Sequence, residues 1–73
     1  MSASIAFSEI ETMLKRCAPG ATWRMATHSR VVIFDGKTYR SLPKYDLVEL
    51  GHVRKMIRYL NINRECAGEF LPL

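Results

Sequence analysis

The stretch VVIFDGKTYRSL, residues 31–42, determines the centre of the fold. An apolar, mostly β-branched run over residues 31–34 is followed by Asp35-Gly36 and then by a second extended run over residues 38–42. An Asp-Gly pair between two such runs is typical of a type I′ hairpin, because both central residues of that turn need a positive φ. The sequence therefore predicts two antiparallel strands that meet at Asp35-Gly36.

A further strand is predicted before this hairpin. Residues 22–27 alternate in character, with Trp23 and Met25 separated by Thr22, Arg24 and Ala26. The connection near residues 26–29 contains no glycine, so this strand has the weaker turn signal. Three antiparallel strands between Ala21 and Pro43 are expected, with Trp23 in the core.

Helical patterns flank these strands. Ser8 and Glu11 have the spacing of a capping box, which predicts that a helix begins there. Its apolar stripe consists of Ile10, Met13, Leu14 and Cys17, and Pro19-Gly20 ends it. A second helix follows a connecting loop at residues 45–49 and ends near Asn61; its stripe consists of Leu50, Val53, Met56, Ile57 and Leu60.

These elements predict one α+β domain over residues 1–73, in the order helix, three-stranded antiparallel sheet, helix. Its core is expected within residues 8–62, and residues 63–73, which lack a clear period, are predicted to form either a loose tail or a segment that orders on a partner. A chain of 73 residues is too short for a large multi-substrate enzyme.

The two cysteines, Cys17 and Cys66, have neither zinc-ligand nor disulfide-framework spacing, so reduced thiols and no metal site are expected. No cofactor motif is found. Residues 1–7 have no signal-peptide pattern, and the apolar run at 31–34 is far too short to cross a membrane. These features predict a cytoplasmic location.

The net charge of +4 is concentrated in the middle of the chain. Residues 24–58 contain eight basic residues against three acidic ones, a local net charge of +5. Such a concentration is typical of a surface that meets a polyanion, although a basic surface can also serve solubility alone. The candidate RNA-binding residues are Arg24, Arg30, Lys37, Arg40, Lys44, Arg54, Lys55 and Arg58.

Two short motifs resemble the HicA family of small bacterial toxins. Thr27-His28 stands before the hairpin, where the family typically has Gly-Ser-His, and residues 49–60, ELGHVRKMIRYL, resemble the family's closing helix. The resemblance covers residues 8–62 and implies a double-stranded-RNA-binding-domain-like fold. It departs from the family at Ala26, which stands in the place of the usual glycine, and an alignment anchored on Trp23 and Phe34 instead puts the catalytic position on Val31.

The resemblance implies a ribonuclease that cuts messenger RNA without a metal or cofactor and that is paired with an antitoxin, HicB. Histidine suits such chemistry because its imidazole exchanges protons near neutral pH, so His28 is the candidate base. Arg30, Lys37 or Arg40 could stabilise charge on the phosphate. The plainer interpretation of His28 is a turn residue; His52 is expected to have no role, and Tyr39, Tyr45 and Tyr59 are expected to serve packing.

Two further functions fit the same basic surface. One is a module that binds nucleic acid without cutting it, with a steep dependence on salt. The other is a protein-interaction domain that recognises an acidic partner.

Overall fold

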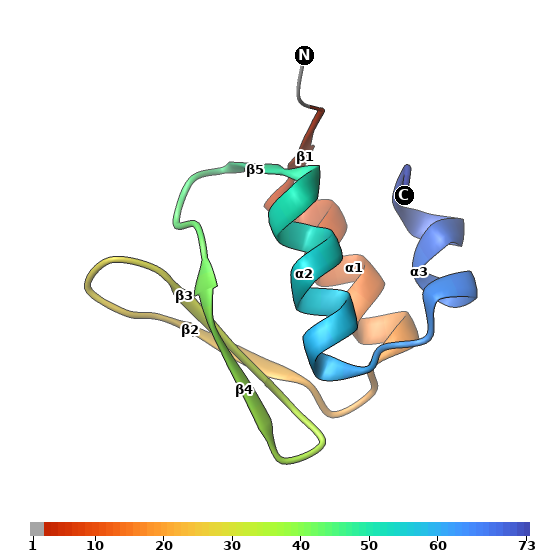
Figure 1. The fold of residues 1–73 in the computed structure, drawn as a ribbon, viewed down its shortest axis with the longest axis horizontal. Helices are drawn as coiled ribbons and strands as arrows, with labels where there is room; N and C mark the ends of the chain where they lie inside the picture. Colours follow the sequence, from red (N-terminus) through yellow and green to blue (C-terminus); the bar gives the residue numbers. More distant parts are fainter. Residues whose placement is uncertain (1–2) are drawn as a thin grey trace.

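A three-stranded antiparallel sheet and the two helices predicted from the sequence make up the body of the protein in this computed structural model, which describes residues 3–73. The sheet has the order β2 (Thr22–Met25), β3 (Arg30–Phe34), β4 (Lys37–Leu42). Helices α1 (Phe7–Cys17) and α2 (Leu50–Leu60) lie side by side on one face of the sheet (Figure 1). Residues 1 and 2 lie outside the described residues. They belong to the predicted domain and to the stretch 1–7 that was searched for a signal peptide.

The predicted hairpin is confirmed. Strands β3 and β4 pair antiparallel, with Phe34 opposite Lys37 on either side of the turn. Asp35 and Gly36 both have positive φ, 52° and 77°, as the Asp-Gly signal requires.

Pairing assigns the side chains of the sheet to two faces. Trp23 and Tyr39 lie opposite the fully buried Val32, so these three residues share the face that meets the helices. Arg24 lies opposite Val31, and Thr38 opposite Ile33, on the outer face. No helix covers that outer face in the part of the chain that the structure describes (Figure 1). Trp23 is 39% exposed, so the expectation that it belongs to the core was wrong.

Residues 45–49 were predicted to form a connecting loop, but only part of this segment is a loop. Leu47–Glu49 is a short strand, β5, that pairs antiparallel with β1 (Ser4–Ala6), so that buried Ile5 lies opposite buried Val48. Each of these strands leads directly into a helix, β1 into α1 and β5 into α2. The β1–β5 ribbon therefore holds together the two helix starts. The core also includes residues that precede residue 8, where it was predicted to begin.

The predicted capping box at Ser8 and Glu11 was also wrong. Helix α1 begins at Phe7, and its N-cap, Ala6, makes no side-chain cap hydrogen bond. The Phe7 amide instead donates to the carbonyl oxygen of Asp46 at 2.8 Å, a contact that the β1–β5 ribbon makes possible. The predicted stripe of Ile10, Met13 and Leu14 is buried, and the helix ends at Cys17 as expected.

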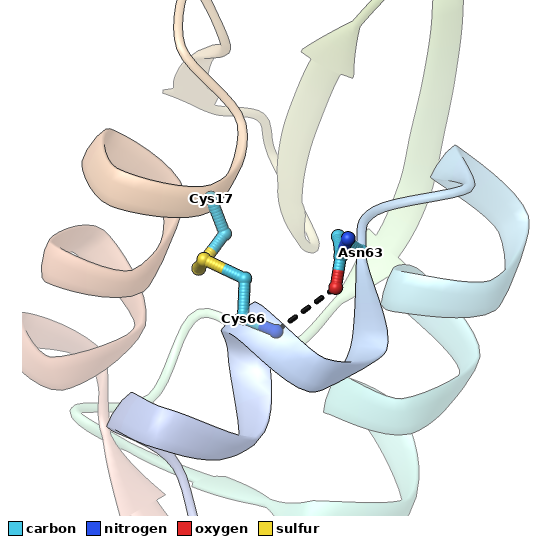
Figure 2. The surroundings of a disulfide bond; sticks show 3 residues. All are labelled: Cys17, Asn63 and Cys66. Carbon is cyan, nitrogen blue, oxygen red and sulfur yellow. Dashed lines mark hydrogen bonds between the residues drawn. A yellow bond between two sulfur atoms is a disulfide. The ribbon is translucent and has the colours of Figure 1, made fainter.

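The predicted loose tail at 63–73 contains a third helix, α3 (Arg64–Phe70). The Asn63 side chain caps it by accepting a hydrogen bond from the Cys66 amide at 2.9 Å (Figure 2). Ala67 and Leu71 are buried in the same core as α1 and α2. Helix α3 lies beside α1, on the side away from the three-stranded sheet (Figure 1).

Helix α3 also carries Cys66, which forms a disulfide with Cys17 at the end of α1 (Figure 2). The Cα atoms are 5.7 Å apart and the cysteines are separated by 49 residues in the sequence. The expectation of reduced thiols was therefore wrong, since a bond across so many residues leaves no local spacing motif. None of the helices described within residues 3–73 has the length and hydropathy that a membrane span needs.

Candidate functional site

His28 lies at the tip of the loop that connects β2 to β3. The Ala26 amide donates to the Ser29 carbonyl oxygen at 2.7 Å, which closes this loop and leaves Thr27 and His28 as its two inner residues. His28 is exposed, so its imidazole is accessible to a ligand.

Two side chains fasten the loop to the end of β4. The Ser29 hydroxyl donates to the Arg40 carbonyl oxygen at 2.6 Å. The Lys44 ammonium donates to the Thr27 carbonyl oxygen at 2.8 Å, next to His28 in the sequence. These bonds bring the Lys44 ammonium to the loop that carries the imidazole.

An open pocket of about 470 Å³ lies between the loop and the chain that leaves β4. It is lined by Thr27, His28, Ser29, Ser41, Pro43, Lys44 and Tyr45. One imidazole, one ammonium and several hydroxyl groups therefore border a single hollow. Tyr45 is 76% exposed, so the expectation that it serves packing was wrong. Its ring is open to stacking contact with a flat ligand such as a nucleobase.

Arg30 holds in place the chain segment that carries Pro43 and Tyr45 of this pocket. It is 5% exposed, and its Nη1 donates to the carbonyl oxygens of Pro43 and Tyr45 at 3.0 and 2.9 Å. Its guanidinium carbon lies 3.6 Å from the centre of the Phe7 ring and 5.8 Å from that of Trp23. Carbonyl dipoles and aromatic faces therefore surround this buried positive charge.

This placement changes the interpretation of Arg30, which the sequence offered as a possible phosphate ligand. Its guanidinium is directed to internal carbonyls, and it holds residues 43–45 against the core. We therefore interpret Arg30 as the residue that positions Lys44 and Tyr45. Nothing in its sequence neighbourhood distinguishes it from the exposed arginines, because its partners come from separate parts of the chain, before β3 and after β4.

Substitution of Arg30 by lysine should lower the free energy of unfolding by about 1–2 kcal/mol. Lysine keeps the charge but lacks the planar group that stacks on Phe7 while donating to two carbonyls. Urea denaturation measures the change. Arg24→Lys, on the exposed outer face, is the matched control and should shift stability by less than about 0.5 kcal/mol. Equal midpoints for the two variants would show that Arg30 has no supporting role.

The other predicted cations do not gather at one place. Arg24 extends from the outer face of the sheet, Arg40 is exposed on β4 where the pairing with β3 is irregular, and Lys37 follows the β3–β4 turn. On α2, Arg54 and Arg58 line a second pocket together with α3, and Lys55 is exposed outside that pocket. The single basic surface expected from the sequence is thus divided, and Lys44 is the predicted cation that shares a pocket with His28.

Two other predicted residues also have clear positions. Val31, the alternative catalytic position, is 2% exposed and has no reactive group. Tyr39 packs on Tyr59 with ring centres 5.7 Å apart, which joins β4 to α2, and burial raises the pKa of the Tyr39 phenol. Tyr39 therefore serves packing as expected.

Comparisons with known proteins found no matching family model, no matching curated protein and no matching solved structure. Within residues 3–73, no three His, Cys, Asp or Glu side chains come together in a way that could hold a metal ion. The geometry of the His28 pocket is therefore the main observation that bears on function.

Proposed function

We propose that this domain is an endoribonuclease that cuts messenger RNA at the His28 pocket, with no metal needed for the bond-breaking step. The observation that supports the proposal most strongly is the shared pocket of His28 and Lys44 at the end of the sheet. A general base and a fixed cation are the two groups that an attack by the RNA's own 2′-hydroxyl requires.

The reaction can be assigned to these residues. The neutral imidazole of His28 takes the proton of a ribose 2′-hydroxyl, whose oxygen attacks the adjacent phosphorus. The bond from phosphorus to the 5′-oxygen of the next nucleotide breaks, and that oxygen takes up a proton from water, while the His28 imidazolium returns its proton to water. The products are a 2′,3′-cyclic phosphate and a 5′-hydroxyl, so atoms and charge balance without a further reactant.

Lys44 would hold the negative charge that grows on the phosphate oxygens. Its ammonium is already placed at the loop by the bond to the Thr27 carbonyl oxygen, and it keeps two further N–H donors for a phosphate. Tyr45 could stack on the base next to the cut, because its ring is exposed at the pocket edge. Arg30 acts only through the chain that carries these two residues.

The motifs that resemble HicA support the same proposal, and they extend it to a bacterial toxin restrained by a HicB-like antitoxin in the cytoplasm. An antitoxin of this kind would cover the His28 pocket. Its gene beside the gene for this domain would support that extension.

The direct test is incubation of the purified domain with a messenger RNA in excess EDTA. Cleavage should proceed in EDTA, and a DNA of the same sequence should stay intact because it lacks the attacking 2′-hydroxyl. Lys44→Gln should slow cleavage by about 10²-fold, the range found when one charge-stabilising donor is removed. Lys55→Gln, which removes the same charge outside the pocket, should not slow it. RNA that stays intact in the presence of correctly folded protein would overturn the nuclease assignment.

A second candidate function rests on the open outer face of the sheet, where Arg24 extends from β2. That face could bind RNA without cutting it. Salt-dependent retention of intact RNA, weakened by Arg24→Gln and unaffected by Lys44→Gln, would favour this function. Capture of an acidic protein with no retention of RNA would favour a protein-interaction domain instead.

A further inference from the structure

A second pocket lies between helices α2 and α3, away from the His28 loop. It has a volume of about 490 Å³ and is lined by Arg54, Ile57, Arg58, Arg64, Glu65, Gly68 and Leu73. It shares no lining residue with the His28 pocket. Its size is within the range of small-molecule sites in proteins.

The charges around this pocket are unbalanced. Arg54 and Arg58 are one turn apart on α2, and Arg64 faces them from the start of α3. Three guanidinium groups and the single Glu65 carboxylate leave a net side-chain charge of +2. In the described part of the chain, none of the three arginines donates a side-chain hydrogen bond to another residue.

One wall of the pocket, helix α3, is fastened to α1. Ile57 is buried and provides an apolar floor on α2. Helix α3 is held by the Asn63 cap and by the disulfide from Cys66 to Cys17 (Figure 2). The helix that carries Arg64 is therefore held to α1 before any ligand arrives, which lowers the entropy lost on binding.

We infer that the pocket between α2 and α3 binds a phosphomonoester, the terminal phosphate of a nucleotide. A phosphomonoester carries a charge of about −1.5 to −2 near pH 7, which balances the positive net side-chain charge of the pocket. A bridging diester carries only about −1. Guanidinium groups bind phosphate oxygens with paired N–H donors. The apolar side chain of Leu73, which is 39% exposed, is available to the organic part of the ligand. This site is separate from the proposed nuclease pocket and does not depend on it.

The test is an NMR titration of the 15N-labelled domain with adenosine 5′-monophosphate, with adenosine as the comparison. Saturable shifts at the amides of Arg54, Arg64 and Gly68 are expected with the monophosphate and not with adenosine. Arg54→Gln and Arg64→Gln should each weaken binding by about tenfold, as the loss of a charged hydrogen bond predicts. Lys55→Gln, on the same helix but outside the pocket, should change it by less than about twofold.

Two sources of the phosphate are separated by a second titration with 5′-phosphorylated and 5′-hydroxyl oligonucleotides. Preference for the phosphorylated oligonucleotide at the same amides would assign the site to RNA ends, and shifts with the mononucleotide alone would assign it to free nucleotides. The inference is overturned if the monophosphate gives no saturable shifts, if its shifts map to the β2–β3 loop, or if Lys55→Gln weakens binding as much as Arg54→Gln.

Discussion

Replacement of His28 by alanine is expected to lower the rate of RNA cleavage by about 10² to 10⁴-fold, the usual contribution of a general base. The affinity for RNA should change little, because Lys44 and Tyr45 remain in the pocket and the loop is closed by the Ala26 and Ser29 backbones. Single-turnover cleavage and binding to a non-cleavable 2′-deoxy substrate measure the two effects separately.

His52→Ala is the matched control for this substitution. His52 lies on α2, does not line the His28 pocket, and should be replaceable without loss of activity. Equal losses from the two substitutions would mean that histidine removal affects folding and not chemistry. An undiminished rate for His28→Ala would remove His28 from the reaction.

Loss of the Cys17–Cys66 disulfide should lower the free energy of unfolding by about 2–4 kcal/mol. The bond closes a long loop, with its cysteines 49 residues apart, and so restricts the unfolded chain strongly. Small domains have total stabilities of only about 5–15 kcal/mol, so this is a large fraction. Urea denaturation with and without a reductant should show the loss.

The double variant Cys17→Ser, Cys66→Ser provides the control for the reductant itself. Its unfolding midpoint should be lower than that of the oxidised wild type and should not respond to reductant. The midpoint of the reduced wild type should approach that of the double variant. The same midpoint for oxidised wild type and the double variant would contradict a stabilising role. Structural disulfides are uncommon in cytosolic proteins, so the proposed cytoplasmic location requires that this bond form in a reducing compartment.

The elements with local signals could be predicted from the sequence. The Asp35-Gly36 turn needs only its own backbone conformation, and it was placed correctly with both flanking strands. Helix α2 was located by the spacing of its apolar residues, and its end at Asn61 has the left-handed conformation that suits a C-cap. These features are determined by residues a few positions apart.

The elements that were missed depend on distant partners. Strand β5 has only three residues, and its pairing partner β1 lies at the other end of the chain. Helix α3 has seven residues and a glycine, so its apolar period is too short to recognise, although Asn63 was an available N-cap signal. Without α3, Cys66 had no predicted neighbour, and the disulfide could not be anticipated.

The sequence provided candidate residues for the site but not their arrangement. It named His28 and eight basic residues, but which of these cations lie near His28 depends on the tertiary structure. Lys44 reaches the loop across the sheet end, and Arg30 is turned inward by carbonyls that follow β4. Side-chain direction at the bulge between Arg30 and Val32 cannot be read from alternation along the strands.

The chemical ends of the cut RNA test the central claim most directly, namely that the imidazole of His28 activates the ribose hydroxyl beside the broken bond. Mass spectrometry of the fragments distinguishes the possible ends. We expect a 2′,3′-cyclic phosphate on one fragment and a 5′-hydroxyl on the other. Fragments with 3′-hydroxyl and 5′-phosphate ends would show that water attacks the phosphorus, and would contradict the role given to His28.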